Sequence, residues 1–334
     1  RRQTFRGRAR FGPGARFGNP NSPCGSRGGV NCWGGRDSFT ERLRQRLGPA
    51  AKDKLIFGEV YDGDPAVLGR YTWRSDWKQN PAPFLDSVLD FQFCFSAREF
   101  LRHPGGHFGS PRSLETAFKN RRAHGPDGRK FYNPNPGPDG RNGADKAITF
   151  IENHDGLNRF RVYGVSERRN RLAQALVLTS PGIPCLYYGT EISLYDPDGR
   201  IGRDGESGRA TLFRSDHDHT WSRMLGSASF GDIGRLTALR RELPALRDGE
   251  FVPLWLDSGE RDDDDGVFAF ARVRADGSRA IVVVNASDKA AVTGELKIEG
   301  LWKAALVIGP EEQPALTNDG RRLPAPAQSL AVWV

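Results

Sequence analysis

The chain has 334 residues, of which 37% are hydrophobic, 27% are charged and four are cysteine, and its formal net charge is +8. These values are typical of a globular protein with one large or two medium domains, and no run approaches the ~20 apolar residues of a membrane-spanning helix. The four cysteines form no Cys-x-x-Cys pair, which excludes a zinc ribbon and a small disulfide-stapled fold.

Residues 1–36 differ sharply in composition from the rest of the chain. They contain eight arginines and nine glycines but no Asp, Glu, Lys, Leu or Ile. Without them the chain has 41 basic and 41 acidic residues, so the net charge belongs to this segment and not to residues 37–334. Three hypotheses stay open for the segment: a disordered Arg/Gly-rich tail, an RNA-binding tail, and a stretch translated out of frame.

The next two hundred residues predict alternating strands and helices. Helices are expected at residues 37–47 with Asp37 as N-cap, and at 110–120, 166–179 and 233–243. Buried strands are expected at residues 54–59, 84–91, 146–155 and 182–189, with Cys94 and Cys185 as buried thiols. This alternation is typical of parallel βα units, which place functional residues at the carboxyl ends of strands.

After about residue 246 the pattern changes to short strands. Residues 267–274 and 295–298 have side chains that alternate with the period of a strand, and residues 279–285 predict a buried strand. Asp276 and Gly277 predict a hairpin turn between two of these strands. We therefore expect a small all-β sandwich domain over residues 246–334.

Three motifs end in polar residues and could carry chemistry. They are FGEV at residues 57–60, FIENHD at 150–155 and PGIPCLYYGTE at 181–191. Each has an ordinary structural interpretation, because a Glu after a strand is usually a loop residue and Asn-His-Asp can form a capped turn. Their order and spacing along one chain are far more specific than any of them alone.

Together these motifs resemble barrel strands five, seven and eight of the α-amylase family of glycoside hydrolases (family 13). Residues 236–247 resemble its last barrel helix and the passage into its C-terminal β-domain. The resemblance implies an α/β fold: the C-terminal half of a TIM (β/α)8 barrel over residues 37–245, from the helix after strand four to helix eight. The β-sandwich domain follows at 246–334, and residues 1–36 are expected to be irregular.

The resemblance also implies roles for particular residues. Glu59 matches the general acid/base, which protonates the leaving glycosidic oxygen. Asp155 matches a carboxylate that stabilises the oxocarbenium-like transition state. His154, Asn153 and Tyr188 match groups that bind the sugar, through hydrogen bonds or ring contact.

One part of the family pattern is missing. A retaining glycosidase needs a nucleophilic carboxylate about 5–5.5 Å from the acid/base. In this family it is the Asp of a Gly-x-Arg-x-Asp pattern at strand four, and no such pattern occurs upstream of Glu59. The first barrel strands and the inserted domain with its calcium ligands are missing too. We therefore expect an inactive C-terminal portion of such an enzyme, with residues 1–36 read out of frame.

The expected function is that of a fragment of a retaining hydrolase or transglycosylase of the α-amylase or cyclomaltodextrinase type, acting on an α-glucan or maltooligosaccharide. A non-catalytic sugar-binding or interaction relative is the alternative, and an Arg/Gly-tailed nucleic-acid binder is a third hypothesis. We expect no cofactor or metal in this chain, although the resemblance allows calcium in a longer parent. No nucleic-acid or membrane partner is expected, and the sequence leaves the compartment open.

Overall fold

The computed structural model describes residues 39–74, 78, 83–102, 110–137, 139–155, 159–195, 224–256, 266–298, 300, 302–309 and 321–334. The Arg/Gly-rich segment and the expected N-cap Asp37 lie outside these residues. In the described part no helix is long and apolar enough to cross a bilayer.

Four short parallel strands form one ladder. They are β1 (Phe57–Gly58), β2 (Ser87–Val88), β3 (Ile148–Thr149) and β4 (Ile183–Pro184). β1 pairs with β2 and β3 pairs with β4, and a parallel bridge between Leu89 and Ile148 joins the two pairs. The connections carry helices, as expected for βα units: α3 (Phe91–Arg102) and α4 (Pro111–Asn120) precede β3, and α5 (Glu167–Thr179) precedes β4.

Two helix starts in the described chain are capped by serine side chains. Ser110 Oγ accepts a hydrogen bond from the Ser113 amide, and Pro111 is the first residue of α4. Ser166 caps α5 in the same way. The other helices are α1 (Phe39–Leu47), η1 (Gly48–Asp53), α2 (Pro65–Arg70), η2 (Thr190–Ile192), α7 (Ala228–Glu242) and α8 (Pro244–Asp248). Pro244 follows α7 by two residues and begins α8.

The two outer strands of the ladder are less buried than predicted. Phe57 in β1 is 48% exposed, because among the described residues β1 has a neighbour on one side only. Cys185 follows β4, the other outer strand, and is exposed, so the prediction of a buried thiol there is wrong. Cys94 is buried as expected, although in helix α3, and burial raises the pKa of its thiol to about 12.

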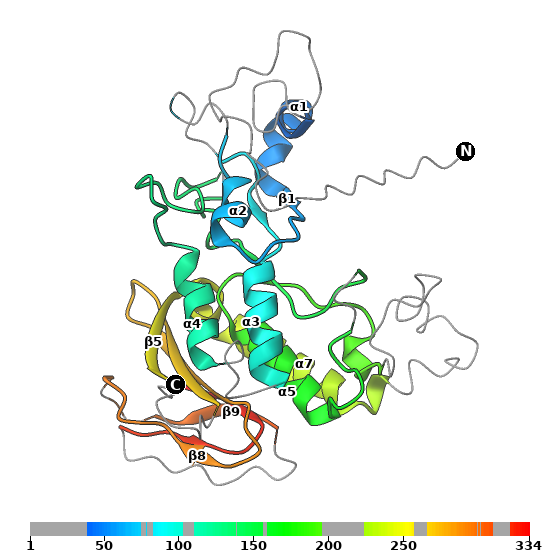
Figure 1. Cartoon of the computed structure of the whole chain (residues 1–334), viewed down its shortest axis with the longest axis vertical. Helices are drawn as coiled ribbons and strands as arrows, with labels where there is room; N and C mark the ends of the chain where they lie inside the picture. Colours follow the sequence, from blue (N-terminus) through cyan, green and yellow to red (C-terminus); the bar gives the residue numbers. More distant parts are fainter. Residues whose placement is uncertain are drawn as a thin grey trace, which may run out of the picture.

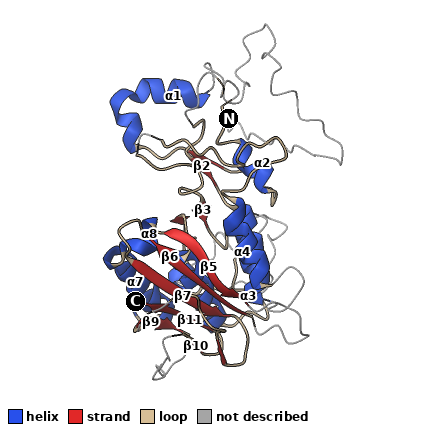
Figure 2. Ribbon diagram, turned by 90° about the vertical axis from the view of Figure 1, so that its left-hand side faces the viewer, coloured by secondary structure: helices blue, strands red, loops and turns tan. Residues whose placement is uncertain are grey.

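The C-terminal part contains a five-stranded antiparallel sheet (Figure 2). Its spatial order is β5 (Glu250–Leu256), β6 (Val267–Val273), β7 (Arg279–Asn285), β11 (Ser329–Trp333) and β9 (Ala304–Ile308). β6 and β7 turn at Gly277, which has φ +82°, as predicted. A second sheet pairs β8 (Ala291–Val292) with β10 (Pro324–Ala325). Residues 295–298 are not a strand, and the Leu296 amide bonds the carbonyl of Arg321 instead.

Both faces of the five-stranded sheet are buried, as β6 illustrates. Phe268 and Phe270 belong to a core cluster that also contains Leu101 of α3 and Leu176 of α5. Figure 1 shows these helices beside the sheet. The alternate residues of β6, such as Ala269, pack in a second cluster on the opposite face. One core therefore runs across residue 245, and the domain boundary there stays a prediction.

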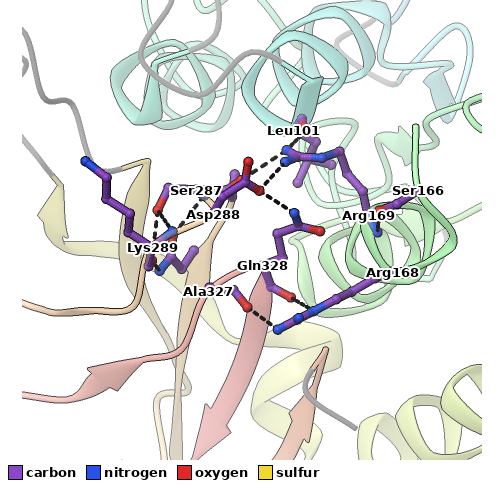
Figure 3. Close-up of polar contacts among 11 residues, drawn as sticks. Leu101, Ser166, Arg168, Arg169, Ser287, Asp288, Lys289, Ala327 and Gln328 are labelled. Carbon is purple, nitrogen blue, oxygen red and sulfur yellow. Dashed lines mark hydrogen bonds and ion pairs between the residues drawn. The ribbon is translucent and has the colours of Figure 1, made fainter. Parts of the chain in front are cut away.

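The start of α5 is tied to the β-domain by two arginines (Figure 3). Arg169 donates to the carbonyls of Leu101 and Ala286 and pairs with Asp288 at 3.0 Å. Arg168 donates to the carbonyls of Ala327 and Gln328. Three segments that are far apart in the sequence thus converge on one helix turn.

We expect Arg169→Met to lower the free energy of unfolding by about 2 kcal/mol, because two carbonyls lose their charged donor. Asp288→Asn is the matched control. Asp288 is 75% exposed, so its loss is expected to cost less than about 1 kcal/mol. Urea unfolding followed by circular dichroism measures both, and equal effects would contradict this assignment.

Candidate active site

The parallel ladder brings the carboxyl ends of its strands to one edge. The amide of Leu89 bonds the carbonyl of Gly58 at 2.9 Å, and that of Cys185 bonds Thr149 at 2.8 Å. The residues that follow the strands therefore share this edge, which we call the carboxyl edge. They include Glu59 after β1, Asp90 after β2, residues 152–155 after β3 and residues 185–191 after β4.

Glu59 follows β1 directly and is exposed. It makes no hydrogen bond or ion pair with another described residue, so its carboxyl group is available to a ligand. Gly58 lies beside it and packs closely, because a Cβ there would lie 2.7 Å from Leu85 Cδ1 and would displace that side chain. Asp64 instead caps α2 by accepting from the Ala66 amide at 2.8 Å.

An aromatic chain connects the loop after β1 with the end of β3. The rings of Tyr61 and Phe91 are 5.0 Å apart, and those of Phe91 and Phe150 are also 5.0 Å apart, both edge-to-face. Phe91 and Phe150 are buried, whereas Tyr61 is 64% exposed. The segments that carry Glu59 and Asp155 are thus held by one apolar support, although the two carboxylates do not contact each other.

Residues 153–155 form a turn after β3 that is fixed by its own side chain. Asn153 Oδ1 accepts a hydrogen bond from the Asp155 amide at 3.1 Å, which orients the backbone of Asp155. Asn153 is buried, with 9% of its surface exposed. The side chains of His154 and Asp155 are 60% and 48% exposed, and 3.9 Å separates His154 Nε2 from Asp155 Oδ2. The imidazole of His154 and the carboxylate of Asp155 therefore lie close together and are accessible to solvent.

Tyr188 lies after β4 and is positioned by a buried arginine. Arg159 Nη1 donates to the Tyr188 carbonyl at 2.8 Å, and its guanidinium lies over the rings of Tyr187 and Tyr188. The next residue, Gly189, has φ +85°, and a Cβ there would come within 3.0 Å of Arg159. The glycine thus permits both the turn and the close approach of the arginine. Tyr188 remains 37% exposed.

Glu152 and Asp90 were not singled out from the sequence, although they shape this edge. Buried Glu152 accepts from the Phe160 amide at 2.7 Å and from the Thr190 hydroxyl, which joins the loops after β3 and β4. Buried Asp90 accepts from the Phe93 amide at the start of α3 and pairs with Arg121. The only sequence signal was a carboxylate directly after an apolar run.

The described residues do not form a metal site. No group of three or more His, Cys, Asp or Glu side chains in this part of the chain is arranged to hold an ion. The carboxylates of the edge are instead bonded to protein groups or exposed singly.

Comparisons with known proteins agree on one family, although no family model matches the chain. The Beta/alpha-amylase of Paenibacillus polymyxa is 27% identical over 246 residues, which are 71% of this chain and 16% of the relative. A Cyclomaltodextrin glucanotransferase of Niallia circulans is 32% identical over 158 residues, 46% of this chain and 18% of the relative. The chain thus spans less than a fifth of these two curated relatives.

The fold is shared with solved structures of the same kind. The alpha-amylase of Geobacillus thermoleovorans, solved in complex with acarbose, superposes with a TM-score of 0.57 at 21% identity. The match covers 84% of this chain and 53% of that one. This confirms the expected fold class, the second half of a (β/α)8 barrel followed by a β-domain.

We expect Glu152→Gln to loosen the loops after β3 and β4, because the amide nitrogen of glutamine replaces one of the two bonded oxygens. Hydrogen exchange of the peptide around Phe160 should become at least tenfold faster. Glu191→Gln is the matched control, since Glu191 lies in the same segment as Thr190 and is not fully buried. Unchanged exchange in Glu152→Gln, or equal acceleration in both variants, would contradict this role.

Proposed function

We propose that the chain is a portion of a member of the α-amylase family of glycoside hydrolases, in which the carboxyl edge, completed by the strand that carries the nucleophile, acts on α-glucosidic bonds of an α-glucan or maltooligosaccharide. The main support is the parallel ladder itself, which brings Glu59, His154 and Asp155 to one edge in the order of the family motifs. Their exposure supports a role toward a ligand, because side chains that serve the fold here are buried.

In this proposal Glu59 is the general acid/base. Its proton passes to the glycosidic oxygen as the bond to the anomeric carbon breaks and the nucleophilic carboxylate of the complete enzyme bonds that carbon. Its carboxylate then takes a proton from the water or acceptor hydroxyl that displaces the nucleophile. Nothing in the described part of the chain pairs with Glu59 and would hold it away from a substrate. The contact between the rings of Tyr61 and Phe91 fixes the loop that follows Glu59.

Asp155 and His154 bind the hydroxyl groups of the reacting sugar. Hydrogen bonds of this kind strengthen as positive charge develops on the ring, so they lower the barrier more than they aid ground-state binding. Asn153 serves by holding the Asp155 backbone, and the exposed ring face of Tyr188 borders the sugar site.

The nucleophile of a retaining reaction belongs on a strand beside β1. β1 has an open side among the described residues, and Phe57 on it is half-exposed. No Gly-x-Arg-x-Asp pattern precedes Glu59, so these 334 residues are expected to catalyse no covalent step. The calcium that the resemblance allows in a longer parent finds no group of three or more His, Cys, Asp or Glu side chains among the described residues.

A second candidate function is sugar binding without turnover. The missing nucleophile favours it, because the residues proposed to bind the sugar, His154, Asp155 and Tyr188, are present while the residue needed for turnover is not. The nucleic-acid hypothesis concerns residues 1–36, which lie outside the described residues, and it stays a prediction.

The decisive experiment begins with the DNA that encodes residues 1–36 and the stretch upstream, read in all three frames. A frame with Gly-x-Arg-x-Asp running into Ser38 supports a working glycosidase. The protein translated in that frame should release reducing sugar from maltoheptaose, and Glu59→Gln should lower kcat at least 10³-fold. The control Asp62→Asn should stay within about twofold of the parent.

Two outcomes would count against the proposal. An unaffected rate in Glu59→Gln would remove the acid/base role. If no frame yields the pattern, calorimetry with maltoheptaose tests the second function, and binding weakened by Asp155→Asn without any release of reducing sugar would favour it.

A further inference from the structure

A cavity of about 120 Å³ lies at the opposite end of the parallel ladder from the carboxyl edge. Its walls come from the end of α4, the loop before β3, the turn before β4, α8, and strands β5 and β6. Its volume corresponds to about four waters at roughly 30 Å³ each, which is room for a small ion but not for a sugar chain.

The cavity is lined by five arginines: Arg121, Arg122, Arg141, Arg247 and Arg272. This is a local excess, because residues 37–334 as a whole carry equal numbers of basic and acidic residues. The arginines are spread over 150 positions of the sequence and form no basic run, so only the fold brings them together.

The three acidic residues in the walls already have cationic partners. Arg122 pairs with Asp145 at 2.5 Å and with Glu250 at 3.4 Å. Asp248 pairs with Arg274, which is not a lining residue, at 2.8 Å. No described carboxylate lies within ion-pair distance of Arg141, Arg247 or Arg272, although Asp248 attracts Arg272 from farther away.

Arg272 is the most deeply buried of the five. It is 1% exposed, and it donates only to the carbonyls of Thr179, Leu246 and Gly249. Neighbouring Arg240 likewise donates only to carbonyls. Burial, and then repulsion from Arg240 and Arg121, lowers the pKa of Arg272 to about 9. A buried positive potential of this kind favours an anion nearby.

Arg121 supplies a donor that is still unused. It is 4% exposed, its Nε pairs with Asp90 and its Nη1 donates to the Pro181 carbonyl at 2.8 Å. Its Nη2 is buried and has no hydrogen-bond partner in the described part of the chain. A buried donor without an acceptor is costly, and an oxyanion in the adjoining cavity would satisfy it.

We propose that this cavity binds a tetrahedral oxyanion of the phosphate class, held by Arg121, Arg141 and Arg247. The planar guanidinium fork is suited to bidentate contact with such oxygens. The anion would lie between the amino ends of β3 and β4, helix α8 and the first two strands of the β-domain. It would therefore stabilise the junction of barrel and β-domain without touching the carboxyl edge, and this site is independent of the proposed sugar chemistry.

Isothermal titration calorimetry of the full chain with inorganic phosphate, at constant ionic strength set with chloride, tests the proposal. We expect one saturable site, and a rise in Tm of about 2 °C at a tenfold excess of phosphate over its Kd. Arg247→Gln removes an exposed lining arginine at little risk to folding and should weaken binding at least tenfold. Arg141→Gln should do the same.

Arg235→Gln is the matched control, since Arg235 is an exposed arginine of α7 that pairs with Asp232 and does not line the cavity. It should bind phosphate like the parent. Phosphate also stabilises proteins by general exclusion from their surface. An equal Tm rise in all variants, or no saturable heat, would therefore overturn the proposal. A second titration uses glucose 6-phosphate in place of inorganic phosphate. Tighter binding of glucose 6-phosphate would support the site and would indicate that its ligand is a phosphorylated metabolite.

Discussion

The ion pair between Arg121 and Asp90 is the interaction on which both ends of the parallel ladder depend. Both side chains are buried, and Asp90 also accepts from the first turn of α3, while Arg121 reaches the carbonyl before β4. Removing one member of such a pair leaves an uncompensated charge and costs about 3–5 kcal/mol. One contact thereby fixes the end of β2, the start of α3, the end of α4 and the turn into β4.

The carboxylates near the ladder divide into two groups by burial. Asp90 and Glu152 are at most 5% exposed, and each bonds groups from more than one segment, so they hold the loops in place. Glu59 and Asp155 are exposed or half-exposed at the same edge. In the proposed reaction Glu59 must gain and lose a proton, and hydrogen bonds from protein donors would oppose this by holding its carboxylate ionised. The geometry thus supports separate structural and chemical roles within one edge.

How far the sequence predicts this structure depends on how local each feature is. The helices at Ser110 and Ser166 were predicted correctly, because an N-cap acts within three residues. The exposure of Phe57 and Cys185 was not, because strand burial depends on which strands lie alongside. Glu152 was missed for the same reason, since its partner Thr190 is 38 residues away. The roles of Glu59 and Asp155 came from the order of motifs, and they stay predictions.

The local distribution of charge cannot be predicted from composition alone. The neutral total of residues 37–334 predicts no extended basic face. Yet arginines from α4, the loop before β3, α8 and β6 converge on one small cavity, where low water content makes each charge act more strongly on the others. Carbonyl groups solvate Arg272 and Arg240 but carry no net charge, so they offset the lost hydration without cancelling the repulsion. A bound counterion would lower that repulsion further, and Arg121, whose Nη2 has no hydrogen-bond partner among the described residues, lines the same cavity.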